Sequence, residues 1–339
     1  MSDAKTPEDT YVHRLSVVIP IYQAERTLQA VLEEVHPLTS PFSTPDGYRA
    51  VVEEVILAYD HGPDRSAELV RQLAQTHSHV KAVWLSRNFG QHAATLAGIA
   101  SSGGDWIVTL DEDGQHDPRF IGSMLDTAMR ESADVVYAEA TNKPPHGYMR
   151  NTASRVSKRL LESVFGGGQA SNFNSYRLIL GEIGRSVAAY SGTGVYLDVA
   201  LSWVAARIVT SPVLLREEGD RRSGYSYRRL MAHFWRMILT SGTRGLRLVT
   251  ATGAFFALGG ILFAIYLVIM RTTVGDIPEG WTSQMVVTAL GTGAILVSLG
   301  IIAEYLGVAV NMALGKPAYL IVRDPRNGPL GHRHGEPAE

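Results

Sequence analysis

The chain has 339 residues, enough for about two domains at roughly 150 residues each. Its 31 lysines and arginines nearly balance 33 aspartates and glutamates, and a net charge of −2 gives no reason to expect a nucleic-acid partner. The absence of cysteine excludes disulfides, thiol catalysis and cysteine-based zinc sites. The polar, acidic N-terminus lacks the apolar core of a secretory signal, so we expect the first domain to stay on the side of synthesis.

The first 230 residues or so alternate between strand-like and helix-like segments. The strand-like segments are Leu15–Ile21, Val52–Tyr59, Val80–Leu85, Trp106–Leu110 and Asp134–Ala138, and the helix-like segments are Glu25–Val35, Ser66–Thr76, Gln91–Ser101 and Pro118–Arg130. This order predicts an α/β fold whose mostly parallel, apolar sheet is covered by helices on both faces. Ligands of such sheets bind beyond the carboxyl ends of the strands, so we expect the site in the loops after Ile21, Tyr59, Leu85 and Leu110.

Two long apolar runs follow the α/β region. Val249–Met270 is an almost uncharged run of about 22 residues, and Met285–Val310 holds a single carboxylate, Glu304. Each is long enough to cross a hydrocarbon core of about 30 Å. Two such runs without amphipathic periodicity predict a two-helix transmembrane hairpin, with buried helices of a soluble domain as the alternative.

Positive charge flanks this pair of runs and is scarce in the loop between them, which contains Arg271 beside Asp276 and Glu279. The flanking residues are Arg244, Arg247, Lys316, Arg323 and Arg326. We therefore expect a multi-pass membrane protein whose catalytic domain and both termini are cytoplasmic.

The sequence predicts four parts: an α/β domain (1–227), a juxtamembrane segment (228–247), two membrane helices (248–312) and a cytoplasmic tail (313–339). Arginines and large apolar side chains alternate in the juxtamembrane segment, which fits an amphipathic helix in the headgroup region or an ordinary solvent-facing helix. The tail is rich in Gly, Pro and His from about Asp324 onward, and we expect that part to be disordered.

An acidic loop, Asp111-Glu112-Asp113-Gly114-Gln115, follows the fourth predicted strand. Carboxylate and carboxamide oxygens in this density suit Mg²⁺ or Mn²⁺. A divalent ion here would bridge the phosphates of a nucleotide diphosphate and offset the charge of the leaving group. An acidic turn without a ligand is the alternative for the Asp111 and Asp113 pair taken alone.

Five motifs together extend over most of the chain. They are Val18-Ile19-Pro20-Ile21-Tyr22, Leu85-Ser86-Arg87-Asn88-Phe89-Gly90, Asp111 to Gln115, Arg221-x-x-Gly224-x-Ser226 and Ile302-Ala303-Glu304-Tyr305-Leu306-Gly307. With them the chain resembles glycosyltransferase family 2, specifically the polyprenyl-phosphate branch of dolichyl-phosphate mannose synthases and bactoprenol glucosyltransferases. The resemblance implies a GT-A type nucleotide-sugar-binding domain, in which Asp111, Asp113 and Gln115 hold the metal and the diphosphate.

The same resemblance implies that Pro20 and Tyr22 border the nucleotide and that Asp60 approaches the base or ribose. The family's Asp-Asp-Gly-Ser-x-Asp run is Asp60-His61-Gly62-Pro63-Asp64 here, with one acid replaced and one residue missing, which leaves base selectivity open. Asp64 also fits a turn or a helix N-cap before Ser66.

Arginines are expected near the donor or acceptor phosphates, because guanidinium groups match phosphate oxygens. By resemblance these are Arg150, Arg155, Arg177 and Arg221, and Arg221 joins Asp111 and Asp113 as a catalytic residue. A solvated helix face is the alternative for Arg150 and Arg155. Relatives often carry an acid in the run before Arg177, where this chain has Ser175.

The implied reaction is inverting transfer of a sugar from a nucleotide-sugar donor to a polyprenyl phosphate (undecaprenyl, decaprenyl or dolichyl), for cell-envelope glycan or lipid modification. No general base is required, because the second pKa of a phosphate monoester is about 6. Membrane lipid and a second copy of the chain are further expected partners. The alternatives are a catalytically altered nucleotide-sugar-binding protein, or a processive polysaccharide synthase, whose usual Gln-x-x-Arg-Trp motif this chain lacks.

The histidines do not predict a zinc site. His61, His77, His79 and His92 lack the i,i+4 pairing on a helix that such sites often use. His332 and His334 lie in the polar tail, where adventitious metal binding is the expected behaviour.

Overall fold

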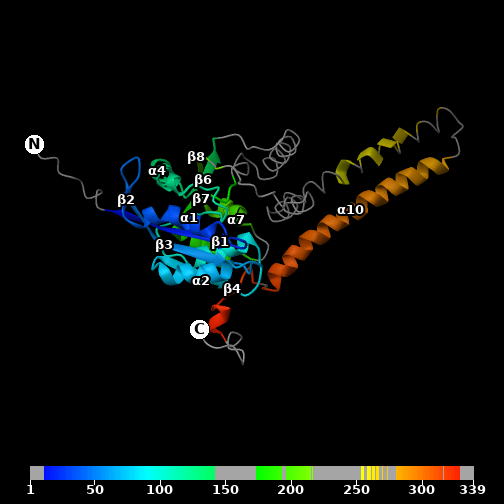
Figure 1. Ribbon diagram of the computed structural model, residues 1–339. Coiled ribbons are helices and arrows are strands. Elements are labelled where there is room, and N and C mark those ends of the chain that lie inside the picture. Colours follow the sequence, from blue (N-terminus) through cyan, green and yellow to red (C-terminus); the bar gives the residue numbers. More distant parts are fainter. Residues whose placement is uncertain are drawn as a thin grey trace, which may run out of the picture. The chain divides into compact units, whose positions relative to one another are not determined.

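The computed structural model describes residues 11–141, 173–192, 196–214, 216, 280–315 and 317–328, with scattered positions between 253 and 273 (Figure 1). The described residues belong to two compact units. The first contains those up to residue 216 together with 317–328, and the second contains those between 253 and 315.

A nine-stranded sheet forms the centre of the first unit, in the order β8-β6-β7-β5-β1-β3-β4-β9, with β2 beside β3. The strands are β1 Val12–Ile21, β2 Phe42–Ser43, β3 Arg49–Tyr59, β4 Val80–Leu85, β5 Trp106–Thr109, β6 Val135–Ala140, β7 Arg177–Leu180, β8 Ile208–Val213 and β9 Ile321–Val322. The pairs β1·β3, β1·β5, β3·β4 and β6·β8 are parallel. Strand β7 runs antiparallel between β5 and β6, and β2 and β9 pair antiparallel with their neighbours. The predicted mostly parallel sheet is therefore confirmed.

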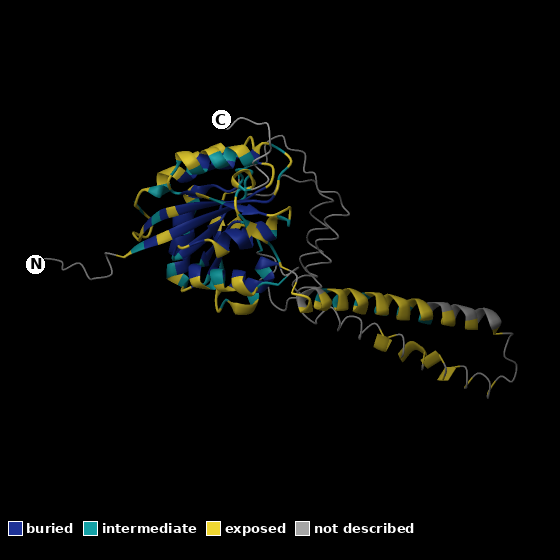
Figure 2. Ribbon diagram, turned by 90° about the horizontal axis from the view of Figure 1, so that it is seen from below, coloured by how far each residue is buried: buried dark blue, intermediate teal, exposed yellow. Residues whose placement is uncertain are grey.

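Helices cover both faces of this sheet, and the strands between them are buried (Figure 2). They are α1 Leu28–Val35, α2 Ser66–Thr76, α3 Gln91–Ala100, α4 Ile121–Glu131, α6 Gly181–Tyr190 and α7 Leu197–Val204, with short 3₁₀ turns η2 His36–Thr39, η3 Pro118–Phe120 and η5 Pro325–Asn327. Alternation along β1 supplies two cores: Val17 and Ile19 pack in one cluster with α1, and Val18 packs in the other with α3. Each fully buried aliphatic side chain contributes roughly 1.5–3 kcal/mol.

The predicted elements as far as β6 are present, and α2 and β4 have the predicted bounds. The predicted helix Pro118–Arg130 is divided into η3 and α4. Its start is set by Asp117, whose side chain accepts a hydrogen bond from the backbone N–H of Arg119. The reversed strand β7, the edge pieces β2 and β9, and α6, α7 and β8 were not predicted.

Helix α10, Trp281–Ala313, dominates the described part of the second unit. Its segment Gly291–Val310 is the one described helix long and apolar enough to cross a membrane, and none of it is buried. Ile295, Leu296 and Val297 each expose more than half of their surface, which contradicts the alternative of a buried core helix for this run. The first predicted span, Val249–Met270, lies largely outside the described residues, although its described positions are helical. The juxtamembrane segment 228–247 lies outside them altogether.

The chain after α10 returns to the first unit. Strand β9 pairs with the end of β4, and the Ser86 N–H donates to the Leu320 carbonyl at 3.0 Å. Arg71 of α2 makes two hydrogen bonds to Asp324, of 2.6 and 2.7 Å, and lies over the Trp84 ring. The expectation of disorder from Asp324 is therefore wrong as far as residue 328, because this pairing anchors the segment to the sheet. Residues 329–339 lie outside the described part.

The Arg71–Asp324 pair should contribute to the stability of the fold, because only 16% and 12% of the two side chains are exposed. We expect Asp324→Asn to lower the free energy of unfolding by about 1.5–3 kcal/mol, the usual range for charged hydrogen bonds. Asp46→Asn is the matched control, because Asp46 pairs with Arg130 on the exposed surface and such pairs contribute about 0–1 kcal/mol. Unfolding of the detergent-solubilised protein measures the change in free energy of unfolding for each variant. An equal loss of stability in Asp324→Asn and Asp46→Asn would contradict the anchoring role of the Arg71–Asp324 pair.

Candidate active site

Three loops meet where β1, β3 and β5 end. The register pairs Ile21 with Tyr59 and Val18 with Thr109, so these strands finish side by side. Backbone hydrogen bonds continue the pairing for one residue, from Asp60 N–H to Ile21 and from Leu110 N–H to Val18. The residues that follow the strands therefore gather at one edge of the sheet, as predicted for a parallel sheet.

Asp111 follows β5 and is held from two sides. Gln91, the first residue of α3, donates from Nε2 to Asp111 Oδ1 at 2.7 Å. Ser175, two residues before β7, donates from Oγ to Asp111 Oδ2 at 2.6 Å. Each carboxylate oxygen keeps a further lone pair, and 23% of the side chain is exposed. Asp111 is thus a fixed carboxylate that a ligand can reach.

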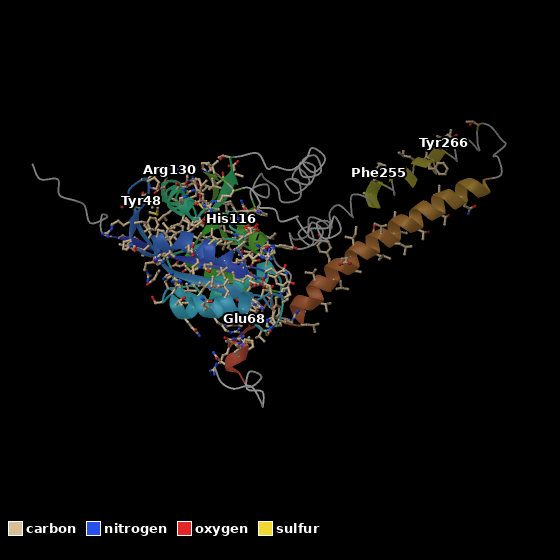
Figure 3. All side chains as sticks on the ribbon, in the orientation of Figure 1. Tyr48, Glu68, His116, Arg130, Phe255 and Tyr266 are labelled. Carbon is tan, nitrogen blue, oxygen red and sulfur yellow. The ribbon has the colours of Figure 1, made fainter. Side chains whose placement is uncertain are left out.

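His116, which is labelled in Figure 3, supports the same loop through a hydrogen bond to its backbone. The Asp111 backbone N–H donates to His116 Nδ1 at 3.0 Å, so the proton of the neutral ring is on Nε2. Burial lowers the pKa of His116, against the opposing pull of Asp111 and Asp113. The ring stacks on Tyr176 with centroids 5.0 Å apart. His116 therefore orders the loop without cancelling its negative charge.

Glu112, between the two aspartates, connects the acidic loop to the loop after β1. Its carboxylate accepts from the backbone N–H groups of Tyr22 at 2.6 Å and Gln23 at 3.0 Å. Asp113 accepts from the N–H of Gln115 at 3.0 Å, which closes the turn. The structure thus joins the backbone of Tyr22 to the loop that contains the predicted metal ligands.

Asp60 orders the loop that leads into α3. It is 2% exposed, and its two oxygens accept from the N–H groups of Phe89 and Gly90, each at 2.7 Å. Burial raises the pKa of Asp60 despite these hydrogen bonds, which act in the opposite direction. Gly90 has a φ of +95°, which favours glycine, and it precedes Gln91. Asp60 therefore acts on Asp111 through Gly90 and Gln91, and its expected approach to the nucleoside stays a prediction.

The altered run after Asp60 forms a tight turn against β1. A side chain at Gly62 would come within 1.5 Å of the Tyr22 carbonyl oxygen, so only glycine fits there. Asp64 accepts from the N–H groups of Glu25 and Ser66, each at 3.2 Å, which supports its interpretation as a turn and helix-start residue. Pro20 is buried in β1, and Tyr22 is 42% exposed.

Arg177 lies inside the protein. It is 3% exposed on β7, its Nε donates to Thr109 at 3.0 Å, and its guanidinium pairs with Asp198. Burial tends to lower the pKa of Arg177, but the nearby Asp198, Tyr137 and Asp111 outweigh burial and raise that pKa above its ordinary value. A guanidinium that is buried and already paired is not available for the predicted phosphate contact. Arg150, Arg155 and Arg221 lie outside the described residues.

Sequence reasoning missed Gln91 and Arg216. Gln91 could have been found as a polar residue at the start of a helix that follows a strand end. Arg216 donates its backbone N–H to the Gln115 carbonyl at 3.1 Å, and its side chain pairs with Glu34 and Asp117. Burial tends to raise the pKa of Asp117, but Arg119 and Arg216 outweigh it and lower that pKa to about 2. No local pattern marks Arg216, because its partners are distant in sequence.

The chain is similar to curated proteins over most of its length. A curated relative from Klebsiella pneumoniae, an undecaprenyl-phosphate 4-deoxy-4-formamido-L-arabinose transferase, is 30% identical over 315 residues, 92% of this chain and 94% of the relative. The protein of that name from Photorhabdus laumondii is 29% identical over 313 residues, 91% and 94% of the two chains.

A crystal structure of glucosyl-3-phosphoglycerate synthase from Mycobacterium tuberculosis with Mn²⁺, uridine diphosphate and phosphoglyceric acid is also similar. It is 17% identical, with a TM-score of 0.47, covering 68% of this chain and 78% of that one. The family model described as Glycosyl transferase family 2 matches residues 16–189, which include the whole acidic loop. The chain therefore belongs to glycosyltransferase family 2.

Proposed function

We propose that this family 2 enzyme is anchored in a membrane and transfers a sugar from a nucleotide-sugar donor to a polyprenyl phosphate, with inversion at the anomeric carbon. The observation that carries the proposal is Asp111, fixed by Gln91 and Ser175 at the edge where β1, β3 and β5 end. Both relatives are named as undecaprenyl-phosphate transferases, and the similarity spans more than nine tenths of this chain. The match therefore extends past the catalytic domain into the apolar region around α10.

Asp111, Asp113 and Gln115 suit a divalent ion. Their side chains offer carboxylate and carboxamide oxygens, the ligands that Mg²⁺ and Mn²⁺ prefer. The donors to the Asp111 carboxylate, Gln91 and Ser175, are neutral and leave its charge in place. A bound Mg²⁺ or Mn²⁺ would neutralise the diphosphate and stabilise it as the leaving group.

The protein's own contribution is positioning. The acceptor phosphate is anionic at neutral pH, because its second pKa is about 6, so no side chain has to remove a proton. Holding donor and acceptor in line lowers the barrier by converting a bimolecular step into one within a complex. In this proposal Pro20 and Tyr22 border the nucleotide, and Arg150, Arg155 and Arg221 supply cations for the phosphates.

A transfer assay tests the proposal. Membranes containing the protein should move label from one of a panel of UDP-, GDP- and dTDP-sugars to undecaprenyl phosphate, and EDTA should abolish the transfer until Mg²⁺ or Mn²⁺ is restored. Asp113→Asn should lower turnover by about 10²–10³-fold, the scale of losing an electrostatic stabiliser. The exposed Asp46→Asn serves as control and should keep wild-type activity. Transfer that survives EDTA, or full activity of Asp113→Asn, would place the chemistry elsewhere.

Chain connectivity supports the predicted hairpin topology. Residues up to 216 and residues 317–328 belong to the same folded unit, joined by β9 and the Arg71–Asp324 pair. A folded unit lies on one side of a membrane, so the chain between its parts crosses an even number of times. If α10 is one crossing, a second must lie between 217 and 280, where Val249–Met270 is the apolar run of sufficient length.

Cysteine labelling tests this topology, because the chain has no cysteine of its own. Asp276→Cys, between the two apolar runs, should react with a membrane-impermeant thiol reagent added outside intact bacterial cells. Asn327→Cys, just after the Asp324 anchor, should react only after the membrane is opened. Labelling of Asn327→Cys in intact cells would overturn the cytoplasmic assignment, and protection of Asp276→Cys in intact cells would overturn the hairpin.

A further inference from the structure

We propose that His36, His77 and His79 form a second metal site, of the imidazole type, that takes Zn²⁺ or a similar divalent transition-metal ion. Their ligating nitrogens lie within 4.8 Å of one another. The three rings also face one another as a group, with centroid separations of 5.5, 5.7 and 6.1 Å. The sequence did not predict a zinc site, because His36 was not grouped with His77 and His79. His36 lies at the end of a different helix, α1.

The backbones of the three histidines are held by regular structure. His36 caps α1 and donates its N–H to Leu32 O. His77 caps α2 and donates its N–H to Leu73 O, and the His79 carbonyl accepts from Val55 N–H in β3. Rotation of the side chains alone would therefore bring the three nitrogens to the distances that a metal ion requires. Zinc–nitrogen bonds of about 2.0–2.1 Å in a tetrahedron bring nitrogens to about 3.4 Å apart, a small step for the exposed ring of His36.

His79 provides an independent observation that points to a ligand. Its Nε2 is buried and has no hydrogen-bond partner among the described residues. An unsatisfied buried nitrogen costs about 1–3 kcal/mol, which a metal–nitrogen bond would offset.

This site is separate from the acidic loop in place and in chemistry. His36 and His77 end helices and His79 precedes β4, so the cluster lies where the strands begin, at the opposite edge of the sheet from Asp111. Imidazole nitrogens suit Zn²⁺, Cu²⁺ and Ni²⁺, whereas the oxygens of the acidic loop suit Mg²⁺ and Mn²⁺. A bound ion would join the end of α1 to the α2–β4 connection. The consequence is stabilisation of the fold, and it does not depend on the proposed reaction.

Zinc titration of the purified full-length protein tests the site. The protein should carry no polyhistidine tag, and excess Mg²⁺ should be present to occupy the acidic loop. We expect one equivalent of Zn²⁺ by calorimetry and an unfolding temperature that rises with Zn²⁺ concentration, because a ligand that binds only the folded state stabilises it. Failure of the wild-type protein to bind Zn²⁺ under these conditions would overturn the proposal.

Variants assign the binding to the three histidines. His36→Gln should weaken Zn²⁺ binding at least tenfold and remove the rise in unfolding temperature, while its unfolding temperature without metal stays near wild type because His36 is exposed. His77→Gln should have the same effect on binding. The matched control is the double variant His332→Gln, His334→Gln, which removes the tail histidines and should bind as wild type does. Wild-type affinity in His36→Gln and His77→Gln, or loss of binding in the tail variant, would contradict the assignment.

Discussion

The hydrogen bonds that hold the Asp111 carboxylate are the constraint on which the rest of the site depends. Gln91 and Ser175 reach it from α3 and from the segment before β7, so two connections of the sheet fix one side chain. Asp60 sets the backbone in front of Gln91, and Glu112 draws in the loop after β1. A carboxylate that is already fixed needs little reorganisation free energy when charge develops beside it. Preorganised sites lower a reaction barrier in this way.

The catalytic unit contains segments from both sides of the apolar region. The catalytic unit is completed by chain that follows α10: β9 extends the sheet, and Asp324 is bonded to Arg71. The described residues on both sides of the apolar region, up to 216 and from 317 to 328, therefore belong to one folded unit. If α10 spans a membrane, as we propose, this connectivity requires an even number of crossings, independently of the hydropathy of the remaining chain.

Local pattern predicted the main strands and helices up to β6, although not the short strand β2, because apolar strands and amphipathic helices carry their own periodicity. It also located the acidic loop, since Asp111 follows a buried strand. It could not predict β7, whose place between β5 and β6 is set by pairing across the sheet. The phosphate role that the resemblance implied for Arg177 likewise did not anticipate the pairing of its guanidinium with Asp198 inside the protein. The supports of Asp111, and the grouping of His36 with the histidines near β4, likewise arise from contacts between residues far apart in the chain.

The most direct test of the account is the Mn²⁺ concentration that gives half-maximal sugar transfer in Gln91→Ala and Ser175→Ala. Each variant loses one hydrogen bond to the Asp111 carboxylate and leaves the predicted metal ligands in place. The account predicts that this concentration rises about tenfold or more in each, the equivalent of about 1.4 kcal/mol, while the unfolding temperature without metal stays close to wild type. An unchanged Mn²⁺ requirement in both variants would contradict it.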